Sequence, residues 1–392
     1  MQHDKITSRI GSKIAISSVG EEPVEAYLPP PLPPDPPVNM QTLTDKLGKA
    51  HWVMGRLDGV SAILPATPIF LYAYVRQEAL LSSQIEGNQS SLSDLLLFEV
   101  DDAPGVPPDD VQEVSNYVAA MNYGLERIAG GFPVSQRLML EIHEILLSRR
   151  RGSTKLPGEF RLSQNWIGGS RPGNALYVPP PPWCVANLMN DLETFIHTDY
   201  PEYTALVKTG LMHVQFETIH PFLDGNGRLG RLMITFLLCA SGLLRHPILY
   251  LSLHFKTYRS RYYELLQRVR THGDWETWLE FFLDGVINTS EHAIETAQKI
   301  LELFERDHEK IKQSGKLASS PLRIHGVLQE RPVLSAPYVV KSAGISLPTV
   351  YSALRHLQSI GIVREVTGKK KNRIFAYDEY FQILNKISDP IA

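Results

Sequence analysis

The sequence predicts a mainly α-helical protein, and three observations support this prediction. From Thr42 onward, apolar residues recur every three to four positions through most of the chain, as they do on one face of a helix. The stretch Lys155–Pro182 interrupts this spacing with glycines and four consecutive prolines. The 392 residues are 43% hydrophobic and 21% charged, which is an ordinary globular composition. At roughly 150 residues per domain, this length predicts two or three domains.

Residues 1–40 form a proline-rich segment that we expect to be extended. Positions up to about Asn39 lack periodic apolar residues, and prolines dominate Leu28–Pro37. Proline has no backbone N–H, so this run favours a polyproline conformation. A strap along the protein surface is the favoured interpretation, and a ligand for a proline-recognition domain is the alternative.

The apolar spacing predicts two groups of helices, one on each side of the loop-rich stretch. The first group comprises Thr42–Leu64, Pro68–Leu81, Val111–Ala129 and Val134–Ser148. The second group comprises Cys184–His197, Glu202–Thr218, Arg228–Leu243, Lys256–Arg270 and Trp275–Lys312. We divide this part of the chain into an N-terminal helical region, residues 41–110, and a second helical domain, residues 111–313.

The stretch Lys155–Pro182 has the composition of a long loop or a two-stranded flap. Short apolar pairs, Trp166-Ile167 and Tyr177-Val178, lie between its glycines and prolines. Ordered loops of this length within compact domains are often functional. We therefore expect this segment to lie at a functional surface.

Residues 314–392 are predicted to form a separate C-terminal domain. Ser314–Pro321 has the composition of a linker, and helices are expected over 322–329, 336–343 and 346–360. Two short strands then flank a lysine-rich turn, and this order of elements resembles a winged helix-turn-helix. The recognition helix would carry Thr349, Tyr351, Arg355 and His356, and the basic wing would carry Lys369, Lys370, Lys371 and Arg373.

The charge distribution indicates a separate role for this domain. Residues 317–392 contain ten Lys or Arg and five Asp or Glu, which leaves −8 for the remainder of a chain with net charge −3. A basic face can bind DNA phosphates, so residues 317–392 are a candidate DNA-binding surface. A winged helix used for protein contacts or for homodimer formation is the alternative.

The sequence favours a cytoplasmic location. Residues 1–10 are polar and no apolar signal segment follows them. No apolar stretch approaches the ~20 residues that a membrane span requires, so we expect no membrane association. The two cysteines, Cys184 and Cys239, lack metal-ligand spacing and fit a reducing compartment.

Residues 220–231, HPFLDGNGRLGR, combine a turn and a helix start in a way that favours anion binding. Gly225 and Gly227 precede the helix, and glycines there let backbone N–H groups converge on an anion. The side chain of Asn226 can add a further donor. The segment therefore predicts a phosphate cradle.

Four side chains of the same segment add the remaining parts of a site for phosphoryl or nucleotidyl transfer. Arg228 and Arg231 lie three positions apart on the first helical turn, so both can face one anion. Asp224 is an oxygen ligand suited to Mg²⁺, and His220 can accept a proton near neutral pH. Each feature alone has a commoner structural role, but together they serve the same anion.

The segment resembles the Fic (filamentation induced by cAMP) signature, His-Pro-Phe-x-Asp/Glu-Gly-Asn-Gly-Arg-x-x-Arg, and matches every specified position. The resemblance implies a mainly α fold, in which a helical catalytic core over roughly residues 110–285 carries a β-hairpin flap. The implied roles are His220 as general base, Asp224 as Mg²⁺ ligand, Gly225, Asn226 and Gly227 as anion hole, Arg228 and Arg231 as triphosphate ligands, and Leu229 and Gly230 within the same nucleotide-binding run. Relatives that phosphorylate carry lysine at the second glycine, so Gly227 favours AMP transfer.

Two further segments extend the resemblance. Asn165–Ser170, with Ile167, Gly168, Gly169 and Ser170, and the later Tyr177-Val-Pro-Pro are similar to the Fic flap, a hairpin that pairs with a target backbone. An ordinary surface loop is the alternative. Tyr262 and Tyr263 resemble a tyrosine pair beside the adenosine pocket, although such a pair is otherwise more often part of a core.

Ser82-Ser-Gln-Ile-Glu-Gly-Asn88 resembles the inhibitory motif of the family, Ser/Thr-x-x-x-Glu-Gly/Asn. Ser82 and Glu86 are four apart and share one helix face. A docked Glu86 followed by Gly87 could pair with Arg231 and occupy the site that the γ-phosphate needs. A solvated glutamate at a helix end is the alternative.

The resemblance implies an autoinhibited protein adenylyltransferase that transfers AMP from ATP, with Mg²⁺, to a Tyr, Ser or Thr hydroxyl of a protein. The enzyme itself is one candidate target. Three alternatives remain open at this stage: a nucleotide-sensing DNA-binding regulator, removal of AMP with Glu86 positioning water, and a different donor such as UTP. The sequence does not identify the target protein.

Overall fold

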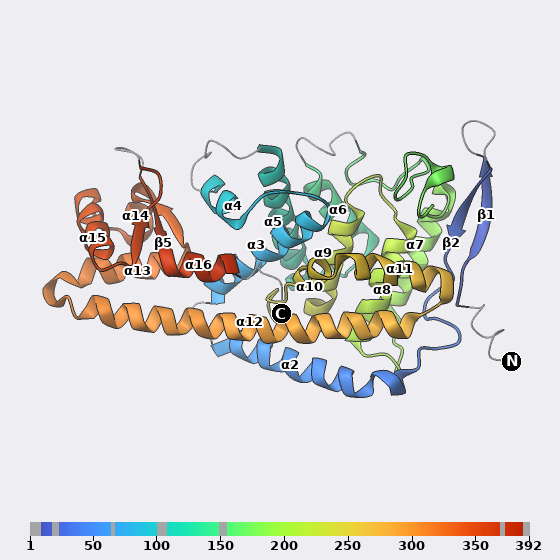
Figure 1. The fold of residues 1–392 in the computed structure, drawn as a ribbon, viewed down its shortest axis with the longest axis horizontal. Coiled ribbons are helices and arrows are strands. Elements are labelled where there is room, and N and C mark those ends of the chain that lie inside the picture. Colours follow the sequence, from blue (N-terminus) through green and yellow to red (C-terminus); the bar gives the residue numbers. More distant parts are fainter. Residues whose placement is uncertain are drawn as a thin grey trace.

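The computed structural model describes residues 9–17, 23–63, 67–99, 108–148, 155–368 and 373–386, and it confirms the mainly helical prediction (Figure 1). The expected wing residues Lys369, Lys370 and Lys371 lie outside the described residues. Up to residue 312 the helices are α2 (Thr44–Ile63), α3 (Thr67–Ile85), α4 (Leu92–Phe98), α5 (Pro108–Ala129), α6 (Gln136–Leu146), α7 (Pro182–His197), α8 (Ala205–Ile219), α9 (Asn226–Ala240), α10 (Ser252–Thr257), α11 (Arg259–His272) and α12 (Trp275–Lys312). Short 3₁₀ turns occur at η1 (Met40–Leu43), η2 (Pro172–Asn174) and η3 (Gly315–Leu317).

Each helix expected from the apolar spacing is present, with ends that differ by a few residues. The helix expected from Glu202 starts at Ala205 because the Thr204 hydroxyl accepts the Val207 N–H at 3.4 Å and caps it. The helix α12 has the bounds that the spacing predicted. The short helices α4, α10 and α16 were not predicted, since fewer than three turns show little periodicity.

The helix α8 lies at the centre of the predicted catalytic domain, residues 111–313, which we call the catalytic part. Every residue from Leu206 to Ile219 except Lys208 is buried, and α7, α9, α11 and α12 pack around it. Gly210 lets α12 approach closely, because a β-carbon there would lie 2.8 Å from Leu279 Cδ2. The Trp278 indole N–H donates to the Gly210 carbonyl at 2.9 Å. This packing fixes the C-terminal end of α8, where the predicted base follows.

The long helix α12 links the catalytic part to the C-terminal domain (Figure 1). Along its N-terminal half it runs beside α2, where Lys46 and Lys49 pair with Asp284 and Glu291 at 2.8 and 3.3 Å. Along its C-terminal half it carries Asp307, which accepts a hydrogen bond from the Tyr377 hydroxyl at 2.8 Å.

The C-terminal domain consists of α13 (Ser319–Glu330), β3 (Val333–Ser335), α14 (Ala336–Ala343), α15 (Leu347–Ser359), β4 (Val363–Glu365), β5 (Ile374–Tyr377) and α16 (Asp378–Lys386). The three strands form an antiparallel sheet in the order β3-β5-β4. The helix α13 begins within the expected linker, and β3 and α16 add to the predicted elements. The winged-helix assignment and the proposed domain boundaries stay predictions.

The C-terminal domain also contacts α3, the helix that carries the expected inhibitory motif. The Gln77 side-chain amide donates to the Leu384 carbonyl of α16 at 2.5 Å. Arg331 donates to the Glu99 carbonyl just beyond α4 at 2.6 Å. The helix α3 therefore contacts both the C-terminal domain and the catalytic part.

The N-terminal segment contains a β-hairpin that the sequence analysis missed. Strands β1 (Ser12–Ser17) and β2 (Pro23–Leu28) pair antiparallel, with Ser12 opposite Leu28. Beyond the hairpin the segment carries no regular element until η1 and contacts the catalytic part, where the Pro30 carbonyl accepts from Gln215 Nε2 at 2.8 Å. Both strands have extended backbone, as expected for this segment, but their antiparallel pairing was not predicted, and the boundary at residue 40 stays a prediction.

The expected flap is an irregular hairpin with one β-bridge. Ile167 pairs with Tyr177. The Ile167 N–H donates to the Tyr177 carbonyl at 2.8 Å, and the Ile167 carbonyl accepts the Leu176 N–H at 2.9 Å. Gly168 and Gly169 adopt φ values of 70° and 71°, which L-residues rarely adopt. The turn therefore ends the pairing after one bridge, and the two full strands predicted as one alternative do not form.

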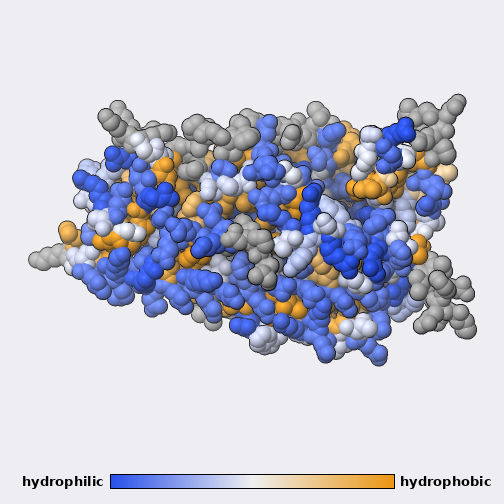
Figure 2. Space-filling view, viewed as in Figure 1, coloured by the Kyte–Doolittle hydropathy of each residue, from blue (hydrophilic) through white to orange (hydrophobic). Residues whose placement is uncertain are grey.

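Large apolar side chains are exposed on this hairpin and beside it. Leu162 and Leu176 are each 81% exposed, and Trp166 and Trp183 are 40% and 70% exposed. Figure 2 shows hydrophobic surface at the upper right, where Figure 1 shows the segment between α6 and α7.

Among the described residues, no helix is both long and apolar enough to cross a bilayer.

Candidate active site

His220 lies directly after α8 in a left-handed backbone conformation, with φ 50° and ψ 61°. This conformation costs a non-glycine residue about 1–2 kcal/mol, so the surroundings must hold it. The buried Arg161 donates to the His220 carbonyl at 2.9 Å, and Asn165 donates to the Phe222 carbonyl at 2.9 Å. Residues at the base of the flap therefore fix the backbone of the predicted base.

The His220 imidazole is largely buried, with 19% of its side chain exposed. The pKa of His220 is lowered to about 4, mainly by burial and in addition by the nearby charges of Arg270 and Arg161. The ring is therefore neutral at pH 7 and has a free lone pair, as a general base requires.

The turn between His220 and α9 is closed by the Asn226 side chain. Its Oδ1 accepts the Phe222 N–H at 2.9 Å, and its Nδ2 donates to the Phe222 carbonyl at 2.8 Å. Nδ2 carries a second N–H that this bond does not use, so the expected donation from the Asn226 side chain to an anion stays a prediction. Asn226 offers an anion its backbone N–H, at the start of α9 behind Gly225 with φ 79°.

Asp224 is held in the same turn by His143 of α6. Gly158 N–H donates to His143 Nδ1 at 2.9 Å, so Nε2 carries the proton and donates to the Asp224 carbonyl at 3.0 Å. The imidazole also stacks on Phe222 with ring centroids 3.8 Å apart. These contacts orient the backbone of Asp224 and leave its side chain 43% exposed.

The Asp224 carboxylate fits a Mg²⁺ ligand. Its Oδ1 accepts the Gly225 N–H at 2.6 Å and Arg228 Nη2 at 3.3 Å, while Oδ2 has no hydrogen-bonding partner among the described residues. No cluster of three or more His, Cys, Asp or Glu suited to a metal occurs in the described part of the chain. Mg²⁺ is commonly bound by one or two carboxylates, substrate phosphates and water, so a single exposed carboxylate suffices.

The two arginines of α9 have different partners. Arg228, 7% exposed, pairs with Glu113 of α5 at 2.5 Å and with Asp224. Arg231, 2% exposed, pairs with Glu86 at 2.6 Å. In this state Arg228 orients the metal-ligand candidate, and Arg231 is neutralised by the candidate inhibitor.

Ser82 in α3 and Glu86 directly after this helix both contact Arg231. Arg231 Nε donates to Ser82 Oγ at 2.8 Å, and Nη2 donates to the Ser82 carbonyl at 3.0 Å. Burial acts to raise the pKa of Glu86, but attraction and hydrogen bonding from Arg231 outweigh it and hold this pKa below its ordinary value. Glu86 follows the C-terminal end of α3, where the helix dipole disfavours an anion, so Arg231 must hold it there.

Glu86 also contacts the predicted anion cradle. A β-carbon at Gly227 would lie 2.2 Å from Glu86 Oε1 and 3.0 Å from Arg231 Nη1. The carboxylate therefore lies directly against the first turn of α9. Gly87, at φ 99°, continues the turn out of α3.

Glu78 anchors α3 one turn before Ser82. The Glu78 carboxylate accepts hydrogen bonds from the Ser252 N–H at 3.1 Å and the Tyr117 hydroxyl at 3.2 Å, and from the Ser252 hydroxyl. Burial raises the pKa of Glu78 to about 7. These buried contacts align Ser82 and Glu86 with α9.

Four other sequence-predicted residues lie in or near the core, and their place in a nucleotide site stays a prediction. Tyr262 is 1% exposed, and its hydroxyl bonds to His213 Nε2 at 2.8 Å, so this ring packs within the core. Tyr263 is 40% exposed. Leu229 is fully buried in the hydrophobic core. Gly230 packs against Glu217, and a β-carbon there would lie 2.6 Å from Glu217 Oε1.

Several site residues were missed because their partners lie far away in sequence. Glu113, His143 and Arg161 contact the 220–231 segment from 59 to 115 positions away. No local pattern marks such contacts. Glu217 could have been recognised as a neighbour of the predicted base, since it lies three positions before His220 in the last turn of α8.

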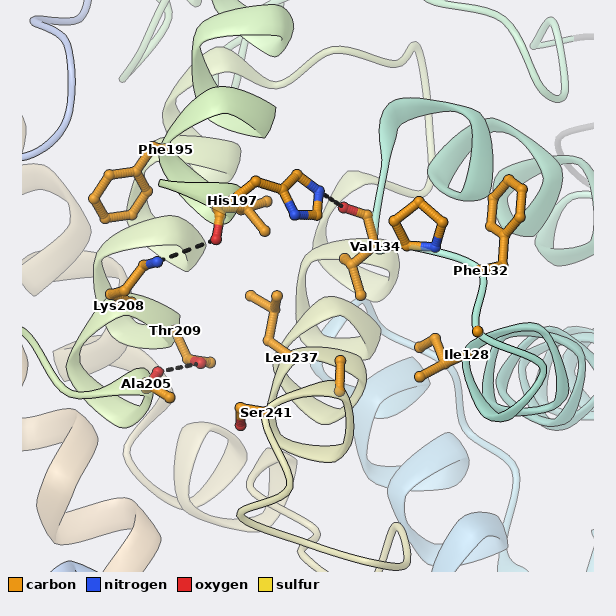
Figure 3. Close-up of a pocket in the computed structure, with 14 residues that line it drawn as sticks. Ile128, Phe132, Val134, Phe195, His197, Ala205, Lys208, Thr209, Leu237 and Ser241 are labelled. Carbon is orange, nitrogen blue, oxygen red and sulfur yellow. Dashed lines mark hydrogen bonds between the residues drawn. The ribbon is translucent and has the colours of Figure 1, made fainter. Parts of the chain in front are cut away.

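A separate cavity of about 460 Å³ lies at the other end of α8 and α9 (Figure 3). Its polar groups satisfy neighbouring helix ends: Lys208 donates to the Thr198 carbonyl at 2.7 Å, and His197 bonds to the Val134 carbonyl at 2.9 Å. None of the predicted site residues lines it. The candidate site is therefore assigned from its chemistry and not from cavity size.

Comparison with known families agrees with the geometry. Residues 44–126 match the family described as Fic/DOC family N-terminal, and residues 133–238 match the Fic/DOC family. A curated relative from Aedes aegypti, named Protein adenylyltransferase Fic, is 32% identical over 216 residues, which cover 54% of this chain and 40% of the relative. Its counterpart from Drosophila willistoni is 30% identical over 203 residues, covering 51% and 38%. The chain therefore spans about two fifths of the length of these relatives.

Solved structures give the same fold. A Fic family protein from Desulfovibrio desulfuricans G20 superposes with a TM-score of 0.56 at 20% identity and covers 87% of this chain and 97% of its own. A Fic domain containing signaling protein from Bacteroides thetaiotaomicron gives a TM-score of 0.50 at 19% identity, covering 63% of this chain and 97% of its own. At these identities the likeness concerns the fold alone.

Proposed function

Because this chain belongs to the Fic/DOC family through residues 44–126 and 133–238, we propose that it is a protein adenylyltransferase. It would transfer AMP from ATP to a Tyr, Ser or Thr hydroxyl of a protein and release pyrophosphate. Relatives named protein adenylyltransferase support the reaction class. The observation that carries the proposal is the arrangement of a neutral His220 beside the glycine-rich start of α9.

In the proposed reaction His220 takes the proton of the target hydroxyl while that oxygen attacks the α-phosphorus of ATP. The bond to the β-phosphate bridging oxygen breaks, and pyrophosphate leaves. The N–H groups of Gly225, Asn226 and Gly227 at the positive end of α9 favour the phosphates. Arg231 would stabilise the triphosphate once Glu86 has left it.

Asp224 would hold Mg²⁺ in this site. The ion would neutralise charge that develops on the phosphate oxygens. Arg228 and His143 keep the carboxylate and its backbone in place, because they bond to Asp224 Oδ1 and to its carbonyl at 3.3 and 3.0 Å.

We propose that Glu86 makes the enzyme autoinhibited. Arg231 is almost completely buried and already bonds to Ser82 and Glu86, so a γ-phosphate must displace Glu86 to reach it. Removal of AMP with Glu86 positioning water remains an alternative that uses the same contact.

The target protein would bind beside the flap. Ile167 directs both its backbone groups toward the other arm of the hairpin, so the preceding Trp166 would direct its own outward, as antiparallel pairing requires. An extended target segment could add to this edge. The enzyme itself is one possible target.

A second candidate function is DNA binding by residues 317–392. The exposed face of α15 includes Thr349 and Arg355, which supports this proposal. His356, expected on the same face, instead bonds to Ser314 Oγ at 2.8 Å. Protein contacts, including a homodimer, are the alternative use of this surface, and the cytoplasmic location stays a prediction.

The test is AMP transfer by the Glu86→Gly variant with labelled ATP, Mg²⁺ and cell lysate. Modified peptides should gain the mass of AMP, and Glu86→Gly/His220→Ala should lose the label. Retention of short duplex DNA by the full-length double variant tests the second function. Label that survives the loss of His220 would contradict the proposed base.

A further inference from the structure

Two buried polar atoms beside the predicted base have no hydrogen-bonding partner among the described residues. They are His220 Nδ1 and Glu217 Oε1. Buried polar atoms are paired in the great majority of cases, so each such atom requires an explanation. Here the two side chains leave α8 within one turn of each other, and His220 Nδ1 lies 3.9 Å from Glu217 Oε2.

We propose that Glu217 is a positioning residue that accepts the Nδ1–H of His220 and thereby leaves Nε2 free to act as the base. The present separation exceeds a hydrogen bond by about 1 Å, which a side-chain rotation can close. This inference rests on the proposed function, since it assigns a partner to the base of that reaction.

The Glu217 side chain is closely surrounded by neighbouring residues. The residue is 6% exposed, and its carboxylate lies against α9, where only a glycine at position 230 leaves room for it. Its backbone carbonyl is held by Arg270 Nη2 at 3.1 Å. The side chain is therefore confined to the space between α8, α9 and His220.

The charges around His220 explain why such a partner is needed. Arg270 and Arg161 both disfavour the imidazolium that forms when His220 takes a proton, while Glu86 favours it. In the proposed active state Glu86 has withdrawn, which removes this support. Glu217 stays beside the ring. Burial raises the pKa of Glu217 to about 7, and its ionised form on Nδ1 both selects the tautomer and stabilises the imidazolium.

The inference is tested first by the tautomer of His220. In ¹⁵N-histidine-labelled Glu86→Gly protein at pH 7, with His220 assigned by its loss in His220→Ala, Nδ1 should carry the proton. In Glu86→Gly/Glu217→Gln the Nδ1-protonated form should fall at least twofold in population. Glu302→Gln in the same background removes a charge from an exposed site on α12 and should leave the spectrum unchanged.

Kinetics supply the second readout. Glu217→Gln should lower kcat for AMP transfer at least tenfold and leave KM for ATP within twofold, because the base and not the nucleotide site is altered. Thermal unfolding checks that the variant is folded.

The outcomes separate this inference from the proposed function. A His220 ring that stays protonated at Nε2 in the parent, or a tautomer unaffected by Glu217→Gln, would overturn the positioning role. If the parent protein transfers no AMP, the proposed function fails, while the ¹⁵N spectra still decide the Glu217–His220 contact.

Discussion

Replacing Glu86 with glycine removes the carboxylate that pairs with Arg231 at 2.6 Å and should activate the enzyme. The contact closes the site in two ways: it neutralises Arg231, and it places Oε1 against Gly227. Ser82 remains bonded to Arg231 in the variant, so α3 should stay docked while the phosphate site opens.

The size of the effect follows from the burial of the pair. A hydrogen bond to a charged group contributes about 1.5–3 kcal/mol, and surface ion pairs contribute about 1 kcal/mol or less. Arg231 is 2% exposed and Glu86 is 36% exposed, so the contact lies between these cases. A contribution of about 1–2 kcal/mol corresponds to roughly a 5- to 30-fold rise in AMP transfer.

The assay is the initial rate of labelled AMP transfer at fixed ATP and Mg²⁺. Glu86→Gln keeps the shape but loses the charge, so its rate should lie between wild type and Glu86→Gly. Glu302→Gln, on the exposed face of α12, should match wild type. A Glu86→Gly rate equal to or below that of wild type would refute the inhibitory role.

Three other changes have defined outcomes. Asn226→Ala removes both bonds to Phe222 and should lower the free energy of unfolding by roughly 2–4 kcal/mol in thermal or urea unfolding; a loss below 0.5 kcal/mol would contradict its structural role. Asp224→Asn should raise the Mg²⁺ concentration for half-maximal transfer at least tenfold, and an unchanged Mg²⁺ titration would exclude it as the ligand. Burial raises the pKa of Glu78 from 4.5 to about 7 in the folded state. Between these two pH values the unfolded chain has lost the proton while the folded state keeps it, so the free energy of unfolding falls by about 3 kcal/mol as the pH rises. Glu78→Gln should remove that part of the decline in urea unfolding between pH 4.5 and 8, and an identical decline would refute the assignment.

Helices with a continuous apolar face could be located from the sequence. The bounds of α12 agree because a helix of 38 residues repeats the apolar spacing many times and ends in the polar residues around Ser314. The hairpin β1–β2 was missed although Ile14 and Ile16 alternate with polar or small residues. Each strand has six residues, too few for a periodic signal beside a proline-rich run.

The site was predictable where its residues are contiguous. The turn from His220 to α9 could be inferred because the base, the glycines and the arginines lie within twelve positions. Side-chain direction could not be inferred: Asn226 turns back to Phe222, and Tyr262 turns into the core toward His213. Contacts such as Glu113–Arg228 depend on how α5 packs against α9, which no local pattern encodes.

The most direct measurement is a crystal structure of the Glu86→Gly variant with a non-hydrolysable ATP analogue and Mg²⁺. Our account predicts phosphate oxygens within hydrogen-bonding distance of the backbone N–H groups of residues 225–227, Mg²⁺ on Asp224, and His220 Nε2 facing the α-phosphate. A triphosphate bound away from the start of α9, or an imidazole turned into the core, would contradict it.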